Sequence, residues 1–231
     1  MIWLSGDSWL DWRSLTKSGL RIDDSIEGLL QNDHYPALSF ARGGAGNLKQ
    51  IDLIQRYSLF NVKFPDYWIH SWTEVGRDIN TKEYTKNSLT DTTLYTANKI
   101  VEISNTLNCK VLVIGGQAPI PKIAQDILGD RVFIVDWKAE LLGTTEYGAS
   151  QYFSLVIQEP ARVPKKQLRK EVNNASLQLD LLTKSTSFPD NAHPGIEEYN
   201  NLYNYIIIII NNFIYIYKYT SRNKKCHRKK Y

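Results

Sequence analysis

The stretch KVLVIGG, at residues 110–116, decides the fold class of this chain. Its continuous run of aliphatic residues indicates a strand buried on both faces, and the paired glycines indicate where that strand ends. Other apolar runs lie at 1–4, 35–41, 66–72 and 131–137. Buried strands that alternate with helical segments are typical of a parallel sheet covered by helices on both faces. The sequence therefore predicts an α/β fold with a parallel sheet.

Segments with helical periodicity separate these runs. Apolar residues at Leu48, Ile51 and Ile54 fit one face of a helix, and Asn47 is a candidate N-cap for it. Three further helices are predicted, at about 92–107, at about 165–182 and after Gly195.

The length and composition fit a single globular domain. A chain of 231 residues is long enough for one sizeable core and short for two. With 42% apolar and 23% charged residues, the composition excludes the disordered and collagen-like classes. We place the domain at residues 1–205 and treat 206–231 as an apolar and then basic C-terminal tail.

The positive charge of the chain belongs to this tail. The sequence has 28 Lys and Arg residues against 24 Asp and Glu residues, a net charge of +4. Seven of the basic residues lie in the last fourteen positions, where no acidic residue occurs; without them, 21 basic residues face 24 acidic ones, a charge of −3. The body is therefore not expected to bind nucleic acid or another polyanion.

The tail begins with the segment YIIIIINNFIYIYKY at 205–219. It is shorter than the roughly 20 mostly apolar residues that a bilayer core requires, and Asn211 and Asn212 interrupt it. We favour a final helix or strand packed on the sheet and followed by a basic end. An anchor at a membrane surface and an aberrant coding sequence are the alternatives.

The cysteines and the N-terminus favour an intracellular chain. Cys109 and Cys226 are far apart in the sequence and lack the spacing of a disulfide framework or a zinc site. The polar residues Ser5-Gly6-Asp7 follow the first apolar residues too soon for a secretory signal. We therefore expect a cytoplasmic protein.

A serine stands at the tip of the first turn. GDSW at 6–9 follows the first predicted strand, and parallel α/β sheets bind ligands beyond the carboxyl ends of their strands. A serine is a weak nucleophile until a base removes its proton. Of the four histidines, His193 is the best candidate base for Ser8, because Asp190 lies three residues before it in a Pro-bounded loop. His70 lies inside a predicted strand, and we interpret it as structural.

Three short motifs carry a resemblance to a known family. GDSW at 6–9, GGAGN at 43–47 and DNAHPG at 190–195 have the order and strand context that are typical of the SGNH or GDSL superfamily of serine esterases. The resemblance covers residues 1–205. It implies a three-layer α/β/α sandwich with a flavodoxin-like parallel sheet of about five strands.

The resemblance also implies roles for individual residues. Ser8 would be the nucleophile, His193 the general base and Asp190 the acid that orients the base. The oxyanion hole would use the backbone N–H groups of Ser8 and Gly46, with Asn47 as an alternative contributor from the glycine block.

One element of the superfamily pattern is missing. A Gly-x-Asn-Asp block is expected after the third strand, where this chain has Ser71-Trp72-Thr73-Glu74, so Thr73 takes the Asn position. Loss of one oxyanion donor can lower a rate about 100- to 1,000-fold. Thr73 or Asn47 would have to compensate, or the enzyme would be slow.

The resemblance implies an acyl-ester hydrolase with no metal or organic cofactor. Trp9 and Trp72 would suit stacking against a sugar, and Arg77 could bind an anionic or sugar-bearing substrate, although core packing and a surface ion pair explain such residues at least as well. We favour an O-acetyl carbohydrate as the substrate class. The alternatives are a catalytically weakened binding domain and a lipid esterase that the tail anchors at a membrane surface.

Overall fold

Strands and helices alternate along the computed structural model, which describes residues 1–11, 13, 21–60, 63–79, 83–84, 86–116, 118–137, 163–164 and 194–227. The strands are β1 (Ile2–Ser5), β2 (Ala37–Ser39), β3 (Tyr67–Trp72), β4 (Glu83–Tyr84), β5 (Lys110–Gly115), β6 (Val132–Ile134) and β7 (Val163–Pro164). The helices are α2 (Ile26–Asn32), α3 (Asn47–Phe60), α4 (Lys86–Thr106), α5 (Lys122–Leu128) and α9 (Ile196–His227). Short 3-10 turns are η2 (Ile22–Asp24), η3 (Val75–Arg77) and η4 (Gly129–Arg131).

Five of the strands form one parallel sheet in the order β2-β1-β3-β5-β6, and β4 pairs with β7 in a separate antiparallel ribbon. Leu4 of β1 pairs with Ser39 on one side and with Ile69 on the other. The chain places β2 on one side of β1 and then crosses over to place β3 on the other side, so the strand order reverses between β1 and β3. This is the flavodoxin-like strand order, so the predicted fold class is confirmed, and such sheets bind ligands where the order reverses.

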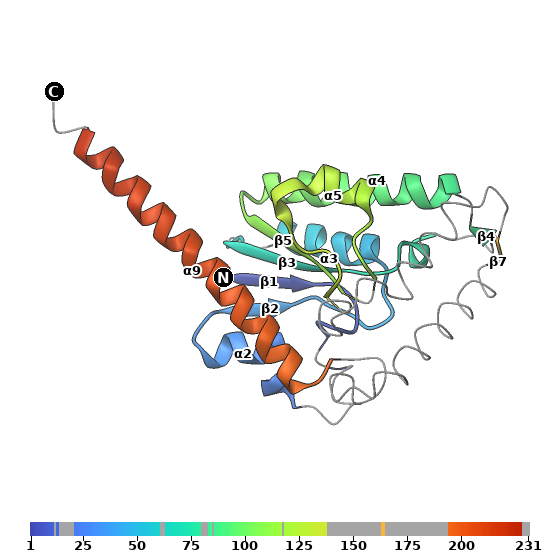
Figure 1. The fold of residues 1–231 in the computed structure, drawn as a ribbon, viewed down its shortest axis with the longest axis horizontal. Helices are drawn as coiled ribbons and strands as arrows, with labels where there is room; N and C mark the ends of the chain where they lie inside the picture. Colours follow the sequence, from blue (N-terminus) through green and yellow to red (C-terminus); the bar gives the residue numbers. More distant parts are fainter. Residues whose placement is uncertain are drawn as a thin grey trace.

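Helices cover both faces of the sheet, which gives the molecule three layers (Figure 1). Side chains alternate along the strands, so Trp68 and Val113 point to one face while Ile69 and Leu112 point to the other. The first face packs against α3, α4 and α5, and the second face packs against α2 and α9. Because both faces are buried, the strands are continuous apolar runs.

The last helix runs across the domain boundary expected at residue 205. α9 is continuous through this position, and Ile206 and Ile210 are buried in the same core as α2. Figure 1 shows the C-terminal part of α9 extending beyond the sheet. Among the described residues, no helix has both the length and the apolar character needed to cross a bilayer. The segment is therefore a helix that packs on the sheet as far as Ile210.

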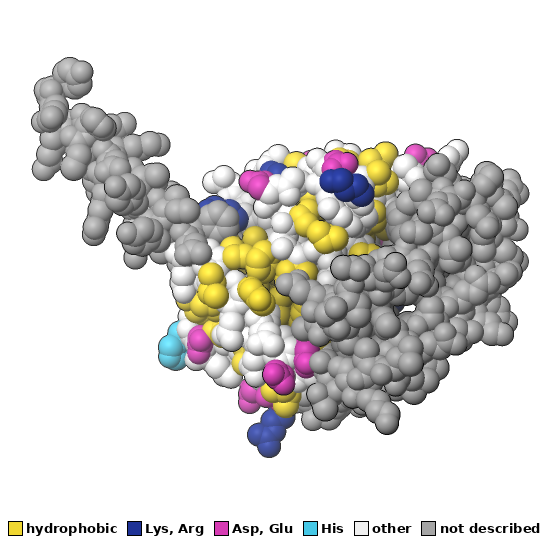
Figure 2. Space-filling model, in the orientation of Figure 1, with side chains coloured by type: hydrophobic (Ala, Val, Ile, Leu, Met, Phe, Trp, Pro, Cys, Tyr) yellow, Lys and Arg dark blue, Asp and Glu magenta, His cyan; other side chains and the backbone are white. Residues whose placement is uncertain are grey.

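Charged side chains of both signs lie among hydrophobic ones on the described part of the face in Figure 2. Several pair within one helix, such as Arg56 with Asp52 on α3 at 2.8 Å and Lys99 with Glu102 on α4 at 2.7 Å. Exposed pairs of this kind contribute little to stability.

Two elements differ from the sequence-based expectation. α4 begins at Lys86 rather than near residue 92, because Leu89 and Thr93 extend its buried face toward the N-terminus. β6 covers only three residues, since the chain bends at Val135. The helix expected at 165–182 lies outside the described residues.

Candidate functional site

Ser8 lies in the tight turn that follows β1. Gly6 leaves the strand with a φ of 144°, which residues with a Cβ rarely adopt. The buried Asp7 then closes the turn: its Oδ1 accepts the Trp9 N–H at 3.1 Å, and its carbonyl accepts the Leu10 N–H at 3.3 Å. Ser8 at the tip is partly exposed. The turn therefore presents Ser8 at the carboxyl end of β1.

The ends of β1, β3 and β5 meet at Ser71. A Cβ on Gly6 would lie 2.6 Å from Ser71 Cβ, and a Cβ on Gly116 would lie 2.0 Å from Ser71 Oγ. Side chains do not fit at such distances, so glycine at both positions lets the three strand ends approach each other. The Ser8 turn thus starts from a closely packed edge of the sheet.

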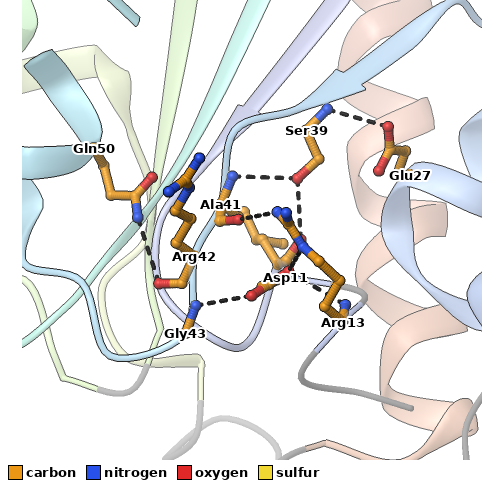
Figure 3. Close-up of polar contacts among 9 residues, drawn as sticks. Asp11, Arg13, Glu27, Ser39, Ala41, Arg42, Gly43 and Gln50 are labelled. Atoms are coloured by element: carbon orange, nitrogen blue, oxygen red, sulfur yellow. Dashed lines mark hydrogen bonds and ion pairs between the residues drawn. The ribbon is translucent and has the colours of Figure 1, made fainter. Parts of the chain in front are cut away.

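The glycine-rich loop 43–46, after β2, is tied to the chain after β1 by Asp11 (Figure 3). Gly43 N–H donates to Asp11 Oδ2 at 2.9 Å. Arg13 Nε pairs with Asp11 Oδ1 at 2.9 Å, and Arg13 Nη2 donates to the Ala41 carbonyl at 3.0 Å. Burial alone would raise the pKa of Asp11, but the hydrogen bonds from Gly43 and Arg13 outweigh burial and lower it. Asp11 is therefore an ionised link between the two loops.

Two more polar contacts support this loop from the helices (Figure 3). Gln50 Nε2 on α3 donates to the Arg42 carbonyl at 3.4 Å, and Glu27 Oε1 on α2 accepts the Ser39 N–H at 3.1 Å. Burial raises the pKa of Glu27, and the hydrogen bond from Ser39 offsets only part of that rise. The chain around the glycines is therefore held from α2, from α3 and from the Ser8 turn.

Asn47 joins the glycine-rich loop to the end of β3. Its side chain is buried; Nδ2 donates to the Thr73 carbonyl at 2.9 Å, and Oδ1 accepts the Thr73 N–H at 2.9 Å. This reciprocal pair corrects one expectation: the Asn47 side chain bonds the end of β3 and does not cap its own helix.

A chain of buried hydrogen bonds supports Asn47 from inside the sheet. Trp68 Nε1–H donates to Ser5 Oγ at 2.7 Å, and Ser5 Oγ lies 2.8 Å from His70 Nδ1. His70 Nε2 lies 3.3 Å from Asn47 Oδ1. Because that oxygen only accepts, Nε2 carries the proton and Nδ1 accepts from the Ser5 hydroxyl. Burial lowers the pKa of His70 to about 3, so His70 is a neutral structural residue, as its place in a predicted strand indicated.

Asp78, which no local pattern singles out, caps α3 from the loop after β3. Its Oδ1 accepts the Leu48 N–H at 3.1 Å, and the amides of Asn47 and Lys49 also bond this carboxylate. Gly46 makes room for it, since a Cβ there would lie 2.1 Å from Asp78 Oδ1. Burial raises the pKa of Asp78 to about 6, although the amide hydrogen bonds and a nearby guanidinium oppose the rise.

The stability contribution of Asp78 should depend on pH. An unperturbed aspartate has a pKa of 3.8, whereas Asp78 in the folded chain has a pKa of about 6. Between these pH values the folded chain therefore binds more protons than the unfolded chain. The stability of the wild-type chain relative to Asp78→Asn should therefore fall as the pH rises from about 4 to about 6 and then stay level. Urea midpoints of both chains across this range measure the effect. A difference that does not vary with pH would contradict it.

The structure contradicts the expectation that Trp9 and Trp72 line the substrate site. Their side chains are 1% and 0% exposed, and they pack in the cores on opposite faces of the sheet, where a sugar ring cannot reach them. Arg77 is engaged as well: its Nε pairs with Glu74 Oε2 at 3.2 Å, and the two side chains are only 13% and 14% exposed. The ion pair expected at the surface is therefore largely buried.

Two of the predicted catalytic residues, His193 and Asp190, lie outside the described residues. The described chain resumes at Pro194, and α9 begins soon after it. The first turn of α9 lies against the Ser8 turn, because the Tyr199 hydroxyl in that turn donates a hydrogen bond of 2.9 Å to the Trp9 carbonyl.

Sequence reasoning missed the acidic residues that hold the site together. Asp11 and Asp78 bind amides that are 32 and 30 residues away in the sequence, so no periodicity or motif marks them. Their one shared signal is position: each follows the end of a strand, β1 or β3, by a few residues. Loop amides gather there, and an acidic side chain can bond them.

No protein-family model and no curated protein matches this chain. Solved structures resemble it at low identity. TesA is 13% identical, with 89% of this chain and 94% of that chain covered and a TM-score of 0.42. The acetyl xylan esterase AlAXEase is 14% identical, with 91% and 100% covered and a TM-score of 0.44. A structure described as a putative acylhydrolase from Bacteroides fragilis NCTC 9343 is 10% identical, with 92% of this chain and 86% of that chain covered and a TM-score of 0.44.

Proposed function

We propose that this chain is an ester hydrolase of the SGNH or GDSL type, with Ser8 as the nucleophile, His193 as the general base and Asp190 as the acid that orients the base. The observation that carries the proposal is the position of Ser8, a partly exposed serine on a tight turn where the strand order reverses between β1 and β3. Sheets of this order bind ligands at that place. The GGAGN and DNAHPG motifs add support from the sequence.

The backbone N–H groups of Ser8 and Gly46 are the proposed oxyanion donors. Neither amide has a hydrogen-bond acceptor within the part of the chain that the structure describes. Thr73 is the proposed third donor because it takes the Asn position of the superfamily pattern, and Asn47 fixes its backbone. Its Oγ1 has no partner among the described residues, but it is fully buried and would have to become accessible when the substrate binds. Donors that are fixed before the reaction stabilise the charge that develops on a carbonyl oxygen. Thr73 would then replace the missing Asn of the superfamily.

The proposed reaction has two halves. Ser8 Oγ attacks the ester carbonyl carbon while His193 takes the hydroxyl proton, and the oxyanion donors stabilise the tetrahedral intermediate. The bond to the alcohol oxygen then breaks, the alcohol leaves with the proton from His193, and an acyl-enzyme remains. Water attacks the acyl carbon with His193 as the base, and the acid is released as Ser8 regains its proton.

We propose the substrate at the level of an acyl ester. The expectation of an O-acetyl carbohydrate depended in part on sugar stacking at Trp9 and Trp72, and both rings are buried. The described residues therefore give that class no support. A short acyl ester such as p-nitrophenyl acetate is the appropriate first substrate, because it requires no recognition of the alcohol.

Covalent labelling tests the proposal. A fluorophosphonate probe bonds to a serine that a neighbouring base activates, so we expect a single adduct on the full-length chain, located at Ser8 by mass spectrometry. The same preparation should hydrolyse p-nitrophenyl acetate. Ser58→Ala is the control variant, because Ser58 lies near the end of α3 and, among the described residues, its hydroxyl bonds the Gln55 carbonyl of the same helix. Absence of both labelling and turnover would contradict the proposal and favour a binding domain.

A further inference from the structure

The backbone of Trp9, the residue after Ser8, is bonded on both sides. Its N–H donates to Asp7 Oδ1 at 3.1 Å, and its carbonyl accepts a hydrogen bond of 2.9 Å from the Tyr199 hydroxyl. The side chains of Trp9 and Tyr199 are buried, so the contact lies inside the protein. The course of the Ser8 turn therefore depends on a side chain that is 190 residues away in the sequence.

An aromatic cluster fixes the direction of the Tyr199 ring. Trp137, which follows β6, contacts the Trp9 ring edge-on at a centroid distance of 5.3 Å and the Tyr199 ring at 5.7 Å. T-shaped pairs of this kind are favourable and directional. Packing thus orients the Tyr199 hydroxyl toward the Trp9 carbonyl, in addition to the hydrogen bond itself.

Tyr199 also belongs to the first turn of α9. Its N–H donates to the Gly195 carbonyl at 3.1 Å, a bond that begins the helix. His193, the proposed base, is two residues before Gly195 in the sequence. One buried hydrogen bond therefore connects the turn that carries the proposed nucleophile to the segment that leads to the proposed base.

We infer that Tyr199 is a positioning residue, whose hydroxyl holds the Ser8 turn against the start of α9 and so fixes the position of the Ser8 nucleophile. The inference rests on the proposed function. A displacement of about 1 Å between reacting groups can lower a rate about 100-fold. The loss of this one hydroxyl should therefore be visible in turnover.

Tyr199→Phe keeps the ring and removes only the hydroxyl. We expect kcat for p-nitrophenyl acetate to fall about 10- to 100-fold, with KM within about twofold of the wild-type value. Labelling of Ser8 by the fluorophosphonate should slow by a similar factor. Titration of reactive sites with the probe, carried to completion, separates this effect from a folding defect, because misfolded chains lower the number of sites and not the rate at each one.

Tyr203→Phe is the matched control. Tyr203 lies one turn further along α9, is buried, and donates its hydroxyl to Asp33 at the end of α2. This variant should lose stability as Tyr199→Phe does, but its kcat should equal that of the wild type. A wild-type kcat in Tyr199→Phe, or an equal loss of kcat in both variants, would overturn this inference and leave the proposed function standing. If the wild-type chain neither turns over the ester nor reacts with the probe, the proposed function fails first.

Discussion

Ser8→Ala is expected to lower kcat for p-nitrophenyl acetate by at least about 1,000-fold relative to the wild-type chain. Alanine has no hydroxyl to attack the carbonyl carbon, so the acyl-enzyme cannot form. The backbone donors of the oxyanion hole remain, and they should leave a small rate above the uncatalysed one. Initial rates at saturating ester, together with complete loss of fluorophosphonate labelling, measure the effect.

Two further variants make this result specific. His193→Ala should lose a similar factor, and the double variant should lose little more, because residues that act as one unit do not contribute additively. Ser58→Ala should keep the wild-type rate. Retention of more than about a tenth of the wild-type kcat in Ser8→Ala would exclude Ser8 as the nucleophile, since nucleophile losses are far larger than tenfold.

The fold could be predicted because each strand is defined by its own residues. In β5, Val111 and Val113 face one core while Leu112 and Ile114 face the other, so burial on both sides requires an uninterrupted apolar run. Short connections then restrict the order in which such strands and helices can pack.

The start of α4 shows where local reasoning fails. Thr93 lies on its buried face and counts as polar in any periodicity analysis, but its hydroxyl donates to the Leu89 carbonyl at 2.7 Å, which satisfies it inside the helix. A polar residue that bonds its own helix can thus extend a buried face. The helix therefore begins earlier than its apolar pattern indicated.

The candidate site was predictable only in part, for a related reason. The Ser8 turn is local, because Gly6 and Asp7 shape it within a few residues of β1. An aromatic ring beside such a turn can line a pocket or fill a core, and only tertiary packing decides which. Trp72 fills a core. The role of Asn47 likewise depends on a partner 26 residues away, which no spacing rule predicts.

Gly6→Ala should destabilise the chain by about 3 kcal/mol or more. Its φ of 144° strains any residue with a Cβ, and that Cβ would lie 2.6 Å from Ser71 Cβ and 2.8 Å from the Ser71 carbonyl oxygen. Those atoms belong to the central strand β3 and cannot move without breaking its pairing with β1 and β5. We expect a large drop in the urea midpoint, and loss of Ser8 labelling in whatever fraction still folds.

Gly44→Ala separates the two causes of this effect. Gly44 also has a positive φ, 74°, but a Cβ at this position would meet nothing within 4 Å. Alanine there should cost only the strain of a left-handed backbone, about 1 kcal/mol. The difference between the two variants then measures the close approach of β1 to β3. Equal urea midpoints would show that Ser71 yields to the added methyl group, and that the closely packed strand edge does not hold the Ser8 turn in place.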